Sequence, residues 1–92
     1  MNISLEYYKI FYYTAQCRSI SAAAQQLSIS QPAVSQGIRQ LEKQLGTQLF
    51  IRTPKGVRLT SEGDMLFAYV SRGYESIQAG EHKLMQMLNR CV

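Results

Sequence analysis

The sequence of 92 residues predicts a mainly α-helical fold, in which three short helices and a two-stranded β-ribbon precede one long helix. Three observations support this prediction. Apolar residues recur at helical spacing in three stretches before residue 46, two β-prone runs flank a turn sequence at 53–56, and no proline follows Pro54. A chain of this length forms one small domain with room for one appended element. We therefore divide it into a domain at 1–60 and a separate helix at 61–92.

The first helix is expected to begin after Ser4, which can cap it, and to run to about Arg18. Its apolar residues fall at helical spacing and are most simply core: Leu5, Tyr8, Phe11, Tyr12 and Ala15. Cys17, near its end, is interpreted as a reduced structural residue.

Ser21 can cap a second, short helix that ends at Leu27. Its small residues, Ala23 and Ala24, would let another helix approach closely. The connection that follows is only three residues long, and we expect its Ile29 to be turned into the core.

The third helix has its start and its stop written in the sequence. Ser30 can cap it, and Pro32 occupies the first turn, where a missing N–H is no loss. Gly46 stands where a left-handed C-terminal residue belongs. A buried stripe is formed by Val34, Ile38, Leu41 and Leu45. Gly37, in the middle of the helix, suggests close packing against a neighbour.

Residues 49–52 and 57–60 are β-prone, and "TPKG" between them suits a type I hairpin turn. The ribbon is basic, since it carries Arg52, Lys55 and Arg58. Thr60 or Ser61 then caps the fourth helix, and Ser61 with Asp64 fits the spacing of a capping box.

From there to about Cys91 we expect one helix of about 30 residues, or about 45 Å. Its apolar stripe includes Leu66, Val70, Ile77 and Leu84. Such a helix is too long to pack entirely on a 60-residue body, so its outer half needs a partner. The alternative is a frayed tail beyond Gly80.

Positive charge is concentrated in the front of the chain. The net charge is +4, and residues 1–60 contribute +5 from seven cations and two anions, whereas residues 61–92 contribute −1. This division favours a polyanion as the partner of the front part. Small basic domains are nevertheless common, so the charge alone does not decide the function.

The outer face of the third helix offers hydrogen bonds and positive charge. A helical wheel places Pro32, Gln36, Arg39 and Lys43 opposite the buried stripe, flanked by Ser35 and Gln40. Glutamine and arginine can make paired bonds to base edges in a major groove, and Ser30 at the helix start suits a phosphate. A short helix, a tight turn and this helix form a helix-turn-helix, beside which the basic ribbon would be a wing that brings Arg52 or Lys55 to the backbone or minor groove.

Other function classes are disfavoured. The single histidine, His82, lies on a polar stretch, and no carboxylate pair, phosphate-binding loop or Cys/His cluster suggests an enzyme, a cofactor or a metal. No stretch resembles a signal peptide or a membrane span, so we expect a cytoplasmic protein. A winged-helix module that makes protein contacts or a dimer without binding DNA is the alternative, although an apolar or acidic third helix would be its signature. A further alternative is that the same surface binds RNA.

The sequence from Leu5 to Gly63 resembles the N-terminal DNA-binding domain of the LysR-type transcriptional regulators. The matching parts are Phe11, "SISAAAQQL", "SQPAVSQGIRQLEKQLGTQLF", Arg52 and "LTSEG". The resemblance implies a winged helix-turn-helix in a regulator of transcription. It also implies that bases or sugars are approached by Gln31, Pro32, Ser35 and Gln36, that Ser30 holds phosphate and that Arg52 reaches the backbone or minor groove.

The resemblance further implies that the last helix is a dimerising linker helix. We expect two such helices to pack antiparallel along the stripe of Leu66, Val70, Ile77 and Leu84, so that the dimer reads a dyad-symmetric operator in duplex DNA. The family's regulators usually continue into a large effector-binding domain, through which a small molecule would act. We therefore expect a fragment, with a natural stand-alone module as the alternative.

Overall fold

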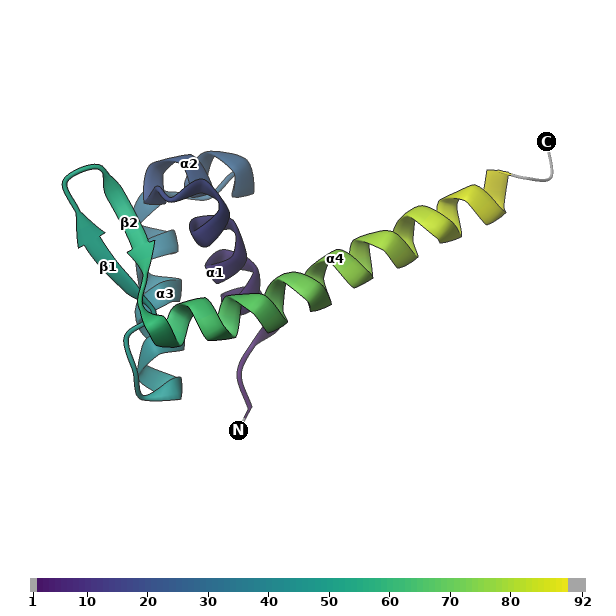
Figure 1. Cartoon of the computed structure of the whole chain (residues 1–92). Coiled ribbons are helices and arrows are strands. Elements are labelled where there is room, and N and C mark those ends of the chain that lie inside the picture. The colour runs from purple at the N-terminus through teal and green to yellow at the C-terminus, as the bar shows by residue number, and fades with distance from the viewer. Residues whose placement is uncertain (1, 90–92) are drawn as a thin grey trace.

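A computed structural model describes residues 2–89, which form four helices and one two-stranded antiparallel sheet. In chain order the elements are α1 (Leu5–Cys17), α2 (Ile20–Leu27), α3 (Gln31–Leu45), β1 (Phe50–Thr53), β2 (Gly56–Leu59) and α4 (Ser61–Asn89). The first three helices and the ribbon form a body from which α4 projects (Figure 1), and the molecule measures 51 × 28 × 20 Å. The predicted winged helix-turn-helix, with a long helix after it, is confirmed.

Serine side chains begin the first three helices. Ser4 and Ser30 accept backbone N–H bonds from Glu6 and Ala33 at 3.2 Å, as predicted. The cap of α2 is different from the prediction: it is Ser19, whose Oγ accepts the Ala22 N–H at 3.1 Å. Ser21 already lies inside the helix, where its hydroxyl pairs with that of Ser19. The cap therefore falls where the backbone is still extended, two residues earlier than predicted.

The turn before α3 contains the second difference. Ser28 ends α2 in the left-handed conformation with φ 56°, and the Ile29 N–H bonds to the Ala24 carbonyl at 3.1 Å. This reversal leaves the Ile29 side chain 38% exposed, so the prediction that it is buried was wrong. Serine rarely adopts a left-handed conformation, so the sequence does not predict this reversal at Ser28. The direction of the Ile29 side chain, which follows from the reversal, is therefore not predicted either.

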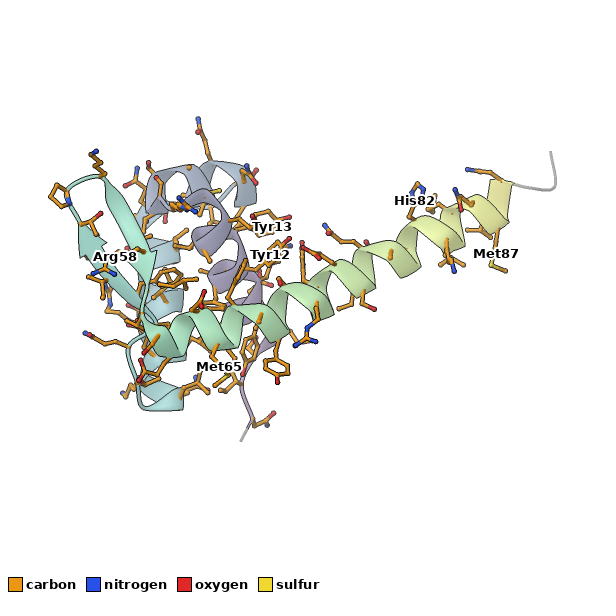
Figure 2. All side chains as sticks on the ribbon, in the orientation of Figure 1. Tyr12, Tyr13, Arg58, Met65, His82 and Met87 are labelled. Atoms are coloured by element: carbon orange, nitrogen blue, oxygen red, sulfur yellow. The ribbon has the colours of Figure 1, made fainter. Side chains whose placement is uncertain are left out.

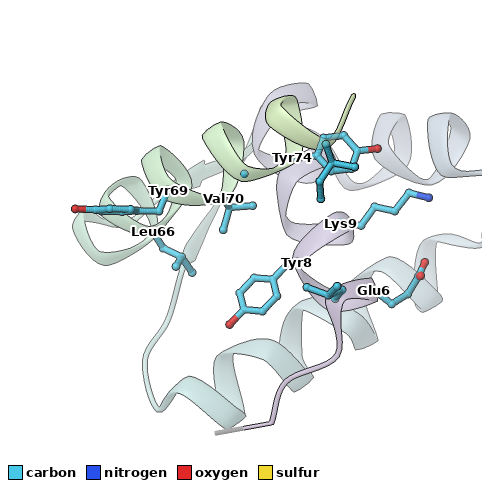
Figure 3. Close-up of a pocket in the computed structure, with 10 residues that line it drawn as sticks. Glu6, Tyr8, Lys9, Leu66, Tyr69, Val70 and Tyr74 are labelled. Atoms are coloured by element: carbon cyan, nitrogen blue, oxygen red, sulfur yellow. The ribbon is translucent and has the colours of Figure 1, made fainter. Parts of the chain in front are cut away.

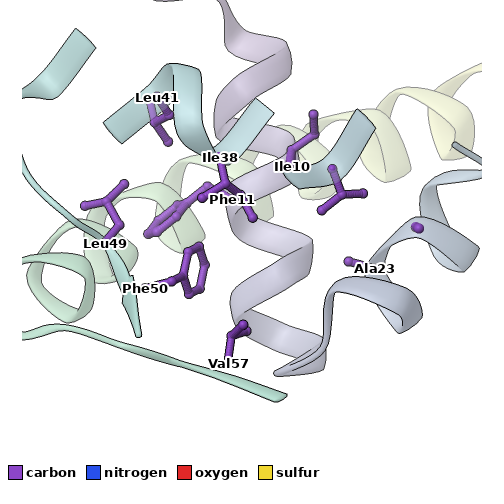
Figure 4. Packing of buried hydrophobic residues seen from close by; sticks show 10 residues of the cluster. Ile10, Phe11, Ala23, Ile38, Leu41, Leu49, Phe50 and Val57 are labelled. Atoms are coloured by element: carbon purple, nitrogen blue, oxygen red, sulfur yellow. The ribbon is translucent and has the colours of Figure 1, made fainter. Parts of the chain in front are cut away.

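The core lies where α1, α2 and α3 meet the ribbon (Figure 4). Phe11 and Val34 are fully buried, and the ring of Phe11 lies 5.4 Å from that of Phe50. Gly37 allows the predicted close approach, since an added Cβ would lie 2.6 Å from Cδ1 of Ile10. Leu5 is an exception among the predicted core residues. It is 78% exposed in the first turn of α1, where it borders an apolar groove shared with Leu66 and Val70 of α4.

The ribbon is anchored to the end of α1. The strands pair in the register Phe50 with Leu59 and Thr53 with Gly56. Compared with the prediction, β1 begins and ends one residue later, and β2 begins and ends one residue earlier. The Val57 N–H bonds to the Arg18 carbonyl at 3.2 Å. A Cβ at Gly56, which has φ 142°, would collide with the same carbonyl. The ribbon can therefore approach α1 this closely only with glycine at this position.

Thr60 begins α4 and joins it to the start of the ribbon. Its Oγ1 accepts the Gly63 N–H at 2.9 Å and donates to the Gln48 carbonyl at 2.8 Å. Of the two predicted caps, Thr60 is therefore the one used. The predicted capping box is not formed, because the Ser61 hydroxyl bonds to the carboxylate of Glu62 instead. A threonine that can reach both partners satisfies more polar groups than Ser61 could.

Only the first part of α4 packs on the body. Leu66, Phe67 and Val70 contact the core, whereas every residue from 75 to 89 is exposed. The helix continues to Asn89, so the alternative of fraying beyond Gly80 is not observed. Cys91, near which the helix was predicted to end, lies outside the described residues. Within residues 2–89, no helix combines the length and the apolar character that crossing a membrane requires.

Candidate nucleic-acid interface

The outer face of α3 is open to solvent. Gln31, Pro32, Gln36, Arg39 and Lys43 are exposed, together with Ser30 at the cap, and Ser35 is half-buried. The stripe of Val34, Ile38 and Leu41 is buried on the opposite side. Since an α-helix places these two sets about half a turn apart, burial of the stripe leaves the polar face outward.

Two of these residues are already paired. The guanidinium of Arg39 donates from Nη2 to Oε1 of Gln36 at 3.1 Å. The bond holds both side chains side by side on the exposed face, three residues apart on one helix surface. It engages the amide oxygen of Gln36 and leaves the NH₂ group of the same side chain free to donate. Helical spacing indicates that the two residues are neighbours, but it does not indicate this bond.

The register of the ribbon gives its basic residues different directions. Arg52 pairs with Val57, which is buried, so Arg52 lies on the side of the ribbon that faces the body. Arg58, labelled in Figure 2, pairs with Ile51 and so lies on the other side of the ribbon. Lys55 lies between β1 and β2, at the tip. All three cations are exposed. The sequence identified the ribbon as basic but assigned no contact to Arg58, which its charge and position now add as a candidate.

A cleft separates α3 from the ribbon. It has a volume of about 240 Å³, and Ser35, Arg39 and Arg52 line it together with Glu42 and Gln48. Three predicted contact residues, from two elements, are therefore brought to one place. Lys43 and Lys55 do not line this cleft, and they lie near the end of α3 and at the tip of the ribbon.

Glu42 holds the ribbon against α3, a role that the sequence alone did not predict. Its Oε2 accepts the backbone N–H groups of Leu49 at 2.7 Å and of Phe50 at 3.2 Å. A carboxylate that accepts two backbone N–H bonds is a strong, charge-assisted link. The only signal in the sequence was an acidic residue on an otherwise neutral or basic helix, a few residues before a β-prone run.

The surface formed by α3 and the ribbon is positively charged. Five cations and one anion lie between residues 31 and 59, so this part alone carries +4, equal to the net charge of the whole chain. The single anion is Glu42, whose Oε2 is engaged by backbone N–H groups. A surface of this kind attracts polyanions and binds them in a salt-dependent manner.

Within residues 2–89, no group of three or more His, Cys, Asp and Glu side chains is placed to hold a metal ion. His82 is exposed on α4, where its ring lies 3.3 Å from the amide of Gln86. Its exposure agrees with the polar stretch of sequence on which it lies.

Residues 5–64 match the sequence model of a family described as bacterial regulatory helix-turn-helix protein, lysR family. A similar protein is the HTH-type transcriptional activator AmpR of Providencia stuartii. It is 42% identical over 71 residues, which are 77% of this chain and 24% of AmpR. The chain thus spans about a quarter of the length of that relative.

Solved structures show the same fold. The chain is similar to the protein in the crystal structure of the BenM_DBD/catB site 1 DNA complex, with a TM-score of 0.81 and 27% identity, covering 94% of this chain and 97% of that one. It is also similar to the protein in the CbnR_DBD–DNA complex, with a TM-score of 0.76 and 26% identity, covering 94% and 99%.

Replacing Glu42 by alanine should lower the free energy of unfolding by about 1–3 kcal/mol, because the Leu49 and Phe50 N–H groups lose their acceptor. Glu42→Gln should lose less, since an amide oxygen can still accept. Chemical denaturation measures both, and Glu81→Ala, at an exposed site on α4, is the matched control. Equal stability of Glu42→Ala and Glu81→Ala would contradict the role given to Glu42.

Proposed function

The chain belongs to the lysR family of bacterial regulatory helix-turn-helix proteins, and from this premise we propose that it binds duplex DNA as a dimer to regulate transcription. The observation that carries the proposal is the exposed, cation-bearing face of α3 beside a basic ribbon. Two of the similar structures are complexes with DNA. We keep residues 1–60 as the part that binds DNA and residues 61–92 as the part that forms the dimer.

In this proposal α3 enters the major groove. Gln31, Pro32, Ser35 and Gln36 approach the bases or sugars, because they occupy the first half of the exposed face. Ser30 contacts a phosphate: its Oγ already accepts the Ala33 N–H, so its hydroxyl proton remains free to donate. The two cations further along the helix, Arg39 and Lys43, contribute charge and, in the case of Arg39, a bond to a base edge.

The ribbon contacts the DNA backbone next to the groove that α3 enters. Arg52 faces the cleft beside Arg39, so a phosphate strand at the cleft would meet cations from both elements. Lys55, at the tip, lies at the end of the ribbon and reaches the backbone or the minor groove. These contacts position the protein, and the side chains of α3 read the sequence.

The dimer is proposed to form through α4. Its apolar side chains Ile77 and Leu84 are 58% and 54% exposed. Leu66 and Val70 are half-buried on the body, and with Ile77 they line an apolar groove of about 510 Å³ between α1 and α4 (Figure 3). Leu5, 78% exposed, borders the same groove. We assign this surface to α4 of a second copy, packed antiparallel, since an exposed apolar patch of this kind marks an interface.

A two-fold dimer would present two copies of α3 about one or more DNA turns apart and would read a dyad-symmetric operator. We propose a cytoplasmic location and a small-molecule effector that acts through residues outside these 92. The alternative of a module for protein contacts alone is not favoured, because the exposed face of α3 carries two cations and several amides rather than apolar side chains.

The affinity for duplex DNA should fall steeply as salt is added. If Arg39, Lys43, Arg52 and Lys55 of both protomers neutralise phosphates, the slope of log affinity against log salt is about −7. Lys55→Gln should make the slope about 2 less steep in the dimer. Fluorescence anisotropy titrations measure this, with Lys83→Gln on α4 as the matched control. A response to salt that is flat in the wild-type chain would contradict the proposal.

Gln36→Ala should weaken binding to a selected operator by about 1–3 kcal/mol for each base contact that the substitution removes, and weaken random DNA less. The operator is obtained by selecting bound duplexes from a random pool. Competition titrations compare the two DNAs, and Gln44→Ala is the control, because Gln44 is exposed on the same helix but away from the proposed face. Equal weakening on both DNAs would reject a base-reading role.

Ile77→Glu should convert the dimer to monomers, because it places a charge within the proposed apolar interface. Sedimentation gives the mass. Gln78→Glu adds the same charge at the next exposed position and should leave the dimer intact. A dimer that persists in Ile77→Glu would show that the interface lies elsewhere.

A further inference from the structure

The direction in which α4 leaves the body depends on the contacts around Tyr74. Tyr74 is its last half-buried residue, and the helix continues from there for 15 more residues, all of them exposed. Those 15 residues extend about 22 Å at 1.5 Å per residue. Whatever holds Tyr74 therefore controls where the far end of α4 points.

Two tyrosines of α1 hold it. The rings of Tyr12 and Tyr74 have centroids 4.5 Å apart, and those of Tyr13 and Tyr74 are 5.7 Å apart in an edge-to-face arrangement. The hydroxyls of Tyr13 and Tyr74 form a hydrogen bond of 3.0 Å. Figure 2 shows Tyr12 and Tyr13 at the place where α1 faces α4. We call these three residues the tyrosine clasp.

Hydrogen bonds extend the clasp on both sides. Gln16 donates to the Tyr12 hydroxyl at 3.0 Å, and that hydroxyl donates to Oε2 of Glu75 at 3.4 Å. The hydrogen bond with Tyr13, and then burial, raise the pKa of Tyr74 to about 12. Tyr74 therefore keeps its proton at neutral pH and can serve as a donor or an acceptor in the bond with Tyr13.

Hydrogen bonds restrict the orientation of the groups that they join more strongly than apolar contacts do. Leu66, Phe67 and Val70 hold the base of α4 on the core, but apolar contacts are not directional and tolerate small rotations. A hydrogen bond between hydroxyls weakens steeply when its distance or angle changes. The clasp, one to two helical turns beyond this base, therefore fixes the tilt that the apolar base leaves adjustable.

We propose that the tyrosine clasp sets the separation of the two α3 helices in the dimer, and so selects the spacing between operator half-sites. The inference rests on the proposed dimeric DNA binding. A tilt of about 10° at Tyr74 moves the far end of α4 by about 4 Å over the 15 residues that follow. One step along a DNA strand is about 3.4 Å. Loss of the clasp thus changes the spacing on the scale of a base pair.

The test is the double variant Tyr13→Phe, Tyr74→Phe, which removes both hydroxyls and keeps the rings that pack. Tyr7→Phe is the matched control: Tyr7 is a half-buried tyrosine of α1, and its hydroxyl has no hydrogen bond within residues 2–89. Each protein is titrated with duplexes that carry the selected half-sites at spacings changed by one base pair at a time, and circular dichroism verifies that each is folded.

The wild-type chain and Tyr7→Phe should prefer one spacing. In the double variant, the ratio of affinities between the best spacing and its neighbours should fall by about threefold or more, as expected when one hydrogen bond is removed. Affinity for a single half-site should not change, since no clasp residue lies on α3 or the ribbon. An unchanged ratio in the folded double variant would overturn the proposal, and so would a wild-type dimer without any preference for spacing.

A second measurement needs no DNA. Pulsed electron paramagnetic resonance reports the tilt as the distance between two spin labels. The labels are attached at Gln25→Cys in α2 and Lys83→Cys in α4, in a chain that also carries Cys17→Ser and Cys91→Ser. The labelled chain is diluted into unlabelled chain, so that only distances within one protomer are seen. The clasp should give one narrow distance, and the double variant should broaden or shift it. Identical distributions would overturn the clasp, whereas a narrow, clasp-dependent distance in a chain that fails to bind DNA would contradict the proposed function instead.

Discussion

The burial of Phe11 is the constraint on which the rest of the structure depends. This side chain of α1 is fully buried, and its ring lies 5.4 Å from Phe50 in the ribbon and 6.2 Å from Phe67 in α4. It belongs to the same cluster as Val34 and Leu41 of α3. One aromatic ring therefore fixes the positions of three elements. Because protein interiors are close-packed, a change at this position would be transmitted to α3, the ribbon and α4 together.

The candidate interface follows from what is buried behind it. Burial of the α3 stripe turns Gln36, Arg39 and Lys43 outward without any contact that holds them there from outside. The ribbon is then tied to α3 by Glu42 and to α4 by Thr60, through bonds between side chains and backbone. These two polar links give the cleft its shape, since they decide how far Arg52 lies from α3. The backbone that carries the cationic surface is therefore positioned by the core and by these two polar links.

The two ends of α4 have different relations to the body. Its first turns belong to the core through Leu66, Phe67 and Val70, although the chain divides into a body and a helix at residue 60 in our proposal. Its last 15 residues are all exposed in a single chain. Between them, α1 uses one side for Ile10 and Phe11 in the core and the adjacent side for Tyr12 and Tyr13 against Tyr74. The same helix, α1, therefore supports the surface formed by α3 and the ribbon and also contacts α4 at Tyr74.

The sequence by itself determined α3 from the Ser30 cap to Gly46, the turn of the ribbon and the length of α4. Capping, periodicity and turn chemistry act within a few residues, so they can be read from a single sequence. The exposure of the predicted contact residues follows from the same periodicity, while their contacts with DNA stay a prediction. Only the tertiary structure decided that Ser19 caps α2, that Ile29 points outward and that Thr60 begins α4. It also decided the roles of Glu42 and the three clasp tyrosines, because each bonds or packs against residues that are distant in the chain or lie on another element.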